Sequence, residues 1–188
     1  MIILTHRLLG NFIYKYIDEQ TPYANKLDRR VFVYGNMKPD IEINYRTMSH
    51  YYCQNQEYVY QLFNDLCTKA YTVITFSDQL GVLLHFLADY TCVFHSSSTL
   101  ESTAIQKHIT YETKLHFSAA RLLKLKNPVT PIQFSSIDEV KQFIQLFIAD
   151  IDNETKRLNV KRDSYFMTLL TLSVALYVLQ KQTALKSY

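Results

Sequence analysis

Two pairs of residues that commonly bind metals stand four positions apart near the middle of this 188-residue sequence. His85 and Asp89 form the first pair, and His108 and Glu112 form the second. Residues four apart project from the same face of a helix. Each pair therefore predicts a helix that directs an imidazole and a carboxylate to one side, and His95 follows the first pair by six residues.

The first pair lies in a strongly apolar segment that begins LGVLLHFLADY at Leu80. A buried carboxylate or imidazole costs several kcal/mol, roughly, unless it is hydrogen-bonded, ion-paired or bound to a metal. A polar network between packed helices is one explanation, and a metal site is the other. Five such residues within about 28 positions favour the metal site. The mixture of imidazole and carboxylate favours zinc over magnesium or calcium.

Three residues nearer the N-terminus are candidates to join this site. His6 falls on the apolar face of a helix expected over residues 4–18. Asp40 follows a Gly35-Asn36 turn signal and Pro39, so we expect it to reach the site from a loop. His50 is expected at or near the start of another helix.

The elements that position these residues are all expected to be helices. The sequence has few glycines (3) and prolines (4), and its apolar residues recur mostly every three or four positions. We therefore predict an all-α, multi-helix bundle that forms a single domain over residues 1–188. Ser77 and Asp78 are expected to cap the helix that carries the first pair. The expected helices span residues 4–18, 54–75, 78–92, 98–126, 136–151 and 164–179.

Capping boxes mark two of these helix starts, Ser98 with Glu101 and Ser136 with Glu139. The last expected helix, residues 164–179, is too short for a bilayer, which needs ~20 residues. We predict that it is buried and that the chain has no transmembrane segment.

Composition restricts the function classes. A net charge of +3, with no basic run between aromatic residues, gives no strong nucleic-acid signal. Three cysteines at unrelated spacings argue against a disulfide framework, and the N-terminal segment lacks the features of a signal peptide. We therefore expect a cytoplasmic protein. No Gly-x-Ser-x-Gly nucleophile motif is present.

The ordered set of candidate ligands resembles the zinc-dependent phospholipase C family, whose all-helical fold is shared with the zinc single-strand nucleases. The steps His-x-x-x-Asp and His-x-x-x-Glu, and the histidine six residues after the aspartate, are similar to the family's core. Thr5-His6 and the Gly-Asn-x-x-Pro-Asp turn at residues 35–40 resemble small bacterial members, here an intracellular one. The set comprises His6, Asp40, His50, His85, Asp89, His95, His108 and Glu112.

The resemblance implies a hydrolase that binds two or three zinc ions. By resemblance, His50, His85, Asp89 and Asp40 would hold one zinc, and His95, His108 and Glu112 a second. His6 would hold a third with Asp89 as the bridging carboxylate. The family's secreted enzymes supply other ligands of that third zinc from an N-terminal tryptophan, and this sequence has no Trp.

The implied activity is hydrolysis of a phosphate ester, most specifically a phospholipase C-like attack of water on a phosphodiester. Asp40 and Asp89 would be the catalytic residues, and a phosphate ester or phospholipid the substrate. Three alternatives stay open at this point. Zinc could be purely structural in a non-catalytic helical module, or the protein could be a zinc nuclease-like phosphodiesterase. A histidine-aspartate phosphohydrolase is disfavoured because the adjacent His-Asp dipeptide is absent.

Overall fold

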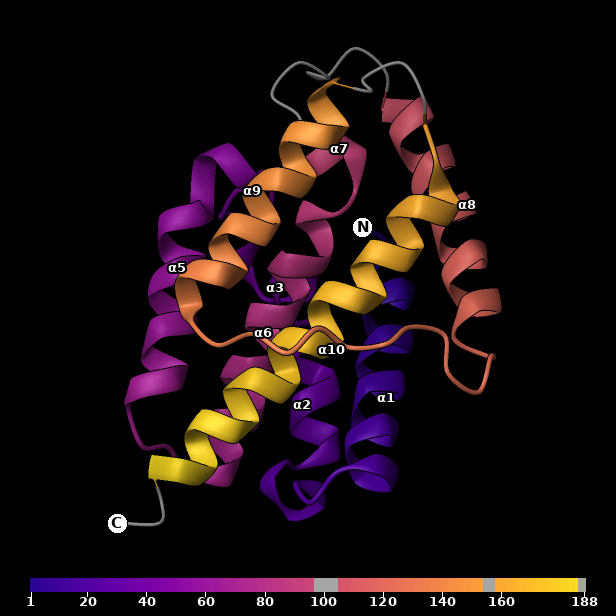
Figure 1. The fold of residues 1–188 in the computed structure, drawn as a ribbon. Helices are drawn as coiled ribbons and strands as arrows, with labels where there is room; N and C mark the ends of the chain where they lie inside the picture. The colour runs from indigo at the N-terminus through magenta and orange to yellow at the C-terminus, as the bar shows by residue number, and fades with distance from the viewer. Residues whose placement is uncertain (97–104, 154–157, 186–188) are drawn as a thin grey trace.

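The computed structural model describes residues 1–96, 105–153 and 158–185, and all regular secondary structure in these ranges is helical (Figure 1). The all-α prediction is therefore confirmed. The helices, in chain order, are α1 (Ile3–Gln20), the 3-10 helix η1 (Ala24–Lys26), α2 (Arg29–Gly35), α3 (Lys38–Ile41), α4 (Ile43–Arg46), α5 (Tyr52–Thr68), α6 (Val73–Tyr90), α7 (Val93–Ser96), α8 (Ile105–Leu122), α9 (Ile137–Asn153) and α10 (Val160–Leu185).

Helix α6 is the centre of the core. Every residue from Leu80 to Tyr90 is buried, because apolar side chains occupy all faces of this segment. Helices α2, α5 and α10 pack against it, and α10 crosses the molecule diagonally in Figure 1. His85 and Asp89 are thus held on a helix that is surrounded by other helices.

Two glycines allow α2 and α6 to approach at backbone distance. A Cβ atom at Gly81 would lie 2.5 Å from the carbonyl oxygen of Phe32, and one at Gly35 would lie 2.5 Å from that of Asp78. Only glycine, which has no Cβ atom, fits at these two positions. This close packing brings the end of α2, including Asn36, against the face of α6 that carries His85.

We predict that Gly81→Ala destabilises the fold by about 1–3 kcal/mol, because the added methyl group meets backbone atoms that cannot rotate away. Chemical denaturation of both proteins measures this difference. Gly10→Ala is the matched control. Its Cβ would lie 3.2 Å from the Asn36 side chain, which can move, so a smaller cost is expected. Equal costs in the two variants would contradict the account of the α2–α6 contact.

Several predicted helix boundaries are wrong. The helix expected over residues 54–75 ends at Thr68, where the Gln182 amide donates to the carbonyls of Leu66 (2.8 Å) and Lys69 (2.5 Å). Val73 begins α6, and the Thr72 hydroxyl accepts its capping hydrogen bond from the Thr75 amide.

The expected caps had mixed outcomes. Ser77 and Asp78 do not cap α6, because they lie within it; the Ser77 hydroxyl accepts instead from the Asp28 amide at 2.8 Å. Ser136 does cap α9, with its hydroxyl accepting from the Glu139 amide at 3.1 Å. The capping box expected at Ser98 and Glu101 lies outside the described residues.

Asp40 lies on the short helix α3 and not on a loop. Pro39 occupies the first turn of this helix, a position that tolerates proline because the missing N–H has no helical partner. The expected final helix is buried as predicted but longer, since it runs from Val160 to Leu185. Within the described residues, no helix combines the length and apolar character that crossing a membrane requires.

Candidate metal centre

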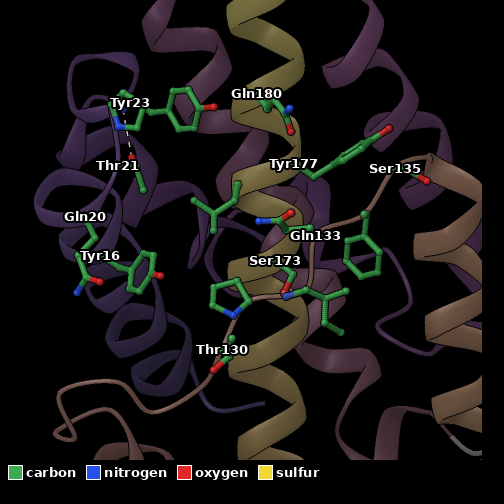
Figure 2. Close-up of a pocket in the computed structure, with 15 residues that line it drawn as sticks. Tyr16, Gln20, Thr21, Tyr23, Thr130, Gln133, Ser135, Ser173, Tyr177 and Gln180 are labelled. Atoms are coloured by element: carbon green, nitrogen blue, oxygen red, sulfur yellow. Dashed lines mark hydrogen bonds between the residues drawn. The ribbon is translucent and has the colours of Figure 1, made fainter.

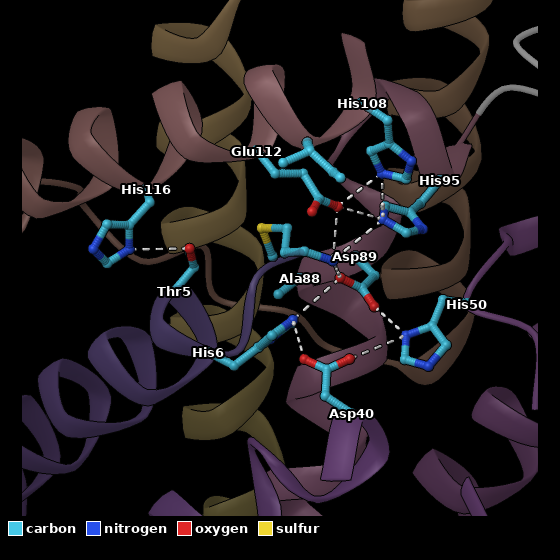
Figure 3. A network of polar contacts seen from close by, with 12 residues as sticks. Thr5, His6, Asp40, His50, Ala88, Asp89, His95, His108, Glu112 and His116 are labelled. Carbon is cyan, nitrogen blue, oxygen red and sulfur yellow. Dashed lines mark hydrogen bonds and ion pairs between the residues drawn. The ribbon is translucent and has the colours of Figure 1, made fainter. Parts of the chain in front are cut away.

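The structure brings all eight candidate ligands into one cluster, and Figure 3 labels all of them except His85. They come from five helices and from the segment that precedes α5. Residues separated by up to 106 positions therefore meet at the same end of the bundle. In order of sequence, they are His6 on α1, Asp40 on α3, His50 before α5, His85 and Asp89 on α6, His95 on α7, and His108 and Glu112 on α8.

A first group of donor atoms surrounds Oδ2 of Asp89. Nδ1 of His50 lies 2.7 Å from this oxygen, and Nε2 of His85 lies 3.2 Å from it. The two nitrogens are 3.2 Å apart. Oδ1 of Asp40 faces both, at 4.0 Å from the His50 nitrogen and 3.8 Å from the His85 nitrogen.

A second group lies on the other oxygen of Asp89. Nε2 of His6 is 3.2 Å from Oδ1 of Asp89 and 3.9 Å from Oδ2 of Asp40. Both the His6 Nε2 and the Asp40 Oδ2 are buried without a hydrogen-bond partner among the described residues. Asp89 therefore directs its two oxygens at different sets of nitrogens.

A third group consists of His95, His108 and Glu112. Oε1 of Glu112 lies 3.0 Å from Nε2 of His95 and 2.8 Å from Nε2 of His108. The two nitrogens are 3.2 Å apart. The ring of Phe94 stacks on that of His108, with centroids 4.9 Å apart, which restricts the orientation of this imidazole.

The backbone just after α2 orients one imidazole. Nδ1 of His85 lies 2.9 Å from the carbonyl oxygen of Asn36, and because a carbonyl only accepts, Nδ1 carries the hydrogen. The ring is therefore oriented with Nε2 toward His50 and Asp89. A second hydrogen bond of this kind is typical of metal-ligating histidines.

The sequence analysis missed the amine of Met1. Its nitrogen lies 2.7 Å from Oδ1 of Asp89 and 3.2 Å from both Nε2 of His95 and Oε1 of Glu112. Burial alone would lower the pKa of this amine, but the carboxylates of Asp89 and Glu112 outweigh it and raise the pKa to about 11. The amine is therefore protonated and forms ion pairs with the carboxylates of the second and third groups. Its proximity in sequence to His6 was the available signal.

The pKa shifts favour the metal-binding forms of four ligands but not of His50, whose pKa the Asp89 carboxylate raises against the opposing effect of burial. Burial dominates at two other imidazoles. It lowers the pKa of His6 to about 3 and that of His95 to about 4, so both imidazoles are neutral near neutral pH. Burial opposes ionisation of Asp89 and Glu112, yet the surrounding positive and hydrogen-bonding groups hold both pKa values well below normal. Neutral imidazoles and ionised carboxylates are the forms that coordinate metals.

These atoms fit zinc. Ligands 2.0–2.1 Å from a tetrahedral zinc lie about 3.3 Å from one another, and the separations within the three groups scatter around that value, from 2.7 to 4.0 Å. Nitrogen and carboxylate oxygen are ordinary zinc donors. The uncompensated His6 and Asp40 atoms are explained if the centre holds cations.

One edge of the cluster reaches the surface. The side chains of Asp40, His50 and His108 are 21%, 19% and 26% exposed, whereas those of His6, His85 and Asp89 are fully buried. A molecule that approaches the centre would therefore meet Asp40, His50 and His108.

Two residues near the centre have other roles. His116 is partly buried, and its Nδ1 lies 3.1 Å from the Thr5 hydroxyl. Cys92 is fully buried beside His95 and Glu112, and burial raises the pKa of its thiol. A protonated, buried thiol is consistent with a packing role for Cys92.

A separate cavity of about 720 Å³ lies between the end of α1, residues 130–135 and α10 (Figure 2). Of the residues that the structure describes, its lining includes none of the candidate ligands and no charged side chain. Tyrosine, glutamine, serine and threonine provide its polar lining, among them Tyr16, Ser173 and Gln180. This composition offers no group that would bind a metal or balance a phosphate.

Asp163, which the sequence analysis also missed, connects two of the ligand-bearing helices. Its Oδ2 accepts hydrogen bonds from the Tyr111 hydroxyl at 2.5 Å and from the Val93 amide at 3.3 Å. Val93 begins the helix that carries His95, and Tyr111 precedes Glu112. Asp163 thereby holds α7 and α8 in register at the third group.

We predict that Tyr111→Phe destabilises the protein by about 1–3 kcal/mol, because the buried Asp163 carboxylate loses a donor. Zinc affinity should fall by about 10- to 100-fold, as it does when groups that orient metal ligands are removed. Denaturation and competition with a zinc chelator measure the two effects. Tyr14→Phe, a hydroxyl deletion on α1, is the control; an equal change in both variants would contradict the role of Asp163.

Comparison with known proteins identifies one family. The family model described as zinc dependent phospholipase C matches residues 5–162, most of the chain. No curated protein and no solved structure matches the chain.

Proposed function

Because the chain belongs to the zinc-dependent phospholipase C family, we propose that it hydrolyses the phosphodiester of a phospholipid, releasing the phosphorylated headgroup. Membership in the family indicates a zinc-dependent, phospholipase C-type hydrolase. The proposal adds the phosphodiester substrate, the residues that act on it and the number of zinc ions.

The observation that carries the proposal is the division of the Asp89 carboxylate between two sets of donors. One oxygen faces His50 and His85, and the other faces His6. A carboxylate placed in this way supports a centre with two or more cations. Hydrolases use such centres on phosphate esters, whereas a structural zinc is usually enclosed by four ligands of its own.

We assign the ligands by these groups. Asp40, His50, His85 and Asp89 would hold one zinc, His95, His108 and Glu112 a second, and His6 and Asp89 would contribute to a third. When bound, zinc would act as a Lewis acid that lowers the pKa of a coordinated water to about 7 and neutralises negative charge on the phosphoryl group of the substrate.

Asp40 has the position that the reaction requires of a general base. It lies at the exposed edge of the centre, and one of its oxygens has no hydrogen-bond partner within the described part of the chain. Burial raises the pKa of its carboxyl above the ordinary value, which increases its basicity once ionised. Asp40 would orient the attacking water and accept its proton, while Asp89 would contribute a ligand to two of the cations.

The test is to incubate the zinc-loaded protein with phosphatidylcholine, phosphatidylethanolamine and phosphatidylglycerol and to quantify diacylglycerol and the phosphorylated headgroup. We expect both products in equal amounts from at least one of these lipids. Asp40→Asn should form less of both products. Its control is Asp138→Asn, which removes an 82%-exposed carboxylate on α9. Release of nucleotides from single-stranded DNA without lipid hydrolysis would contradict the proposal and identify a nuclease.

We also propose that the protein acts in the cytoplasm. All three cysteines are free, and two of them, Cys67 and Cys92, are buried. Free thiols are compatible with a reducing compartment.

A further inference from the structure

A groove follows the outer side of α8 where this helix meets the start of α10. Two adjoining cavities, of about 470 and 710 Å³, form it and share Lys114 and Val160 in their walls. The groove therefore continues from Lys107, which precedes the candidate ligand His108, to Leu125 beyond the end of α8. None of the eight candidate ligands lines it.

The charge of this groove has a single sign. Lys107, Lys114 and Arg121 recur every seven residues and so lie along one line of α8. Lys161 adds a fourth cation from α10. Among the described residues, no acidic side chain lines either cavity, and the acidic residue of the Ile105–Leu122 segment, Glu112, is buried in the candidate metal centre.

Large apolar side chains stand among these cations and are exposed. Phe117 is 60% exposed, Leu125 59%, Leu158 54% and Tyr165 42%, and all four line the groove. Large apolar side chains are uncommon in a group on a helix face that contacts only water. Removing their apolar surface from water would lower the free energy. This cationic groove thus combines positive charge with apolar surface that the described chain leaves uncovered.

We propose that the cationic groove docks the protein on an anionic phospholipid surface. Lysine and arginine bind the acidic headgroups, while Phe117 and Leu125 enter the boundary with the acyl chains. A nucleic acid would satisfy the charges but would offer no apolar phase to these side chains. The inference extends the proposed function, since Lys107 at one end of the groove adjoins the candidate ligand His108, but it does not depend on catalysis.

The test is sedimentation of the zinc-loaded protein with vesicles of phosphatidylcholine alone and with vesicles that also contain phosphatidylglycerol. We expect binding to the mixed vesicles and weaker binding as salt is raised. The K114Q/R121Q variant should bind about 30-fold more weakly, because each cation near an anionic surface contributes about 1 kcal/mol, or about fivefold. K15Q/R30Q, with the same loss of charge at exposed sites outside the groove, should bind as the unchanged protein does.

Three results would overturn the inference: equal binding to neutral and anionic vesicles, equal loss in the two double variants, or binding to single-stranded DNA in preference to vesicles. Hydrolysis of a short-chain, monomeric phospholipid separates docking from catalysis. K114Q/R121Q should retain this activity and its zinc. If the unchanged protein binds vesicles but hydrolyses neither substrate, the proposed function fails and the docking inference stands.

Discussion

Replacement of Asp89 by alanine is expected to abolish hydrolysis, to release zinc and to lower thermal stability. The Asp89 carboxylate is fully buried and lies within 3.2 Å of donor nitrogens from His6, His50 and His85. Under the proposed assignment, removing it would deprive two cation positions of a shared anion, and the charge of any remaining cation would be less well balanced in a buried site. We expect activity to fall by about a thousandfold or more, which corresponds to several kcal/mol of lost stabilisation of the transition state.

The stability change should be about 3–5 kcal/mol, the usual cost of removing one partner from a buried charge pair. Elemental analysis and thermal melting of the purified variant measure both effects. Asp89→Asn keeps the shape of the side chain and distinguishes loss of charge from a cavity; it should lose zinc as the alanine variant does. Unchanged zinc content together with an unchanged melting temperature would contradict the assignment of Asp89 as a shared ligand.

Replacement of Asp40 by asparagine is expected to reduce kcat by about 10²–10⁴-fold, the contribution typical of a positioned general base. Because His50, His85 and Asp89 remain, the variant should still bind zinc when the metal is supplied. Asp40 lies on the surface-reaching edge of the centre, with 21% of its side chain exposed, so the fold should melt at nearly the same temperature as the unchanged protein.

Steady-state kinetics on the best substrate, with zinc content measured on the same preparation, provide the test. Asp138→Asn should have the activity of the unchanged protein. If Asp40→Asn retains full kcat with full zinc content, Asp40 is not the base. If it loses zinc in proportion to activity, Asp40 acts only as a ligand.

Patterns between residues close together in the sequence predicted the all-helical structure and the two ligand pairs correctly. Spacing of three and four residues predicted an all-helical protein, and it placed His85 with Asp89, and His108 with Glu112, on single helices, where the structure has them. Such pairs depend only on helical geometry. The order of the remaining ligands added a resemblance that the family match now supports.

Features that depend on contacts between distant segments were not predictable. In the sequence, Gly35 indicates only a turn, and Gly81 is a glycine within an apolar helix. Only the folded structure shows that the two are in contact. In the structure, α6 begins at Val73, earlier than predicted, and Asp40 lies on a helix instead of the predicted loop. Tertiary packing decides such boundaries more than local propensity does.

The parts of the site that the sequence analysis missed are non-local for the same reason. The Asn36 group that contacts His85 is a backbone carbonyl, which the residue type does not reveal. Asp163 lies 52 residues from its hydrogen-bond partner Tyr111. The cationic groove went unnoticed because the net charge of +3 is small for the whole chain. Its cations are concentrated on one side of α8, and the overall composition conceals that distribution.

The most direct test of the central claim is the metal content of the chain, measured by elemental analysis on protein purified without chelators or metal-affinity resin and then supplied with zinc. The ligand groups described above predict two or three zinc ions per chain, and Asp89→Asn should fall below two. One ion or none in the unchanged protein, after zinc has been supplied, would contradict a polynuclear hydrolytic centre.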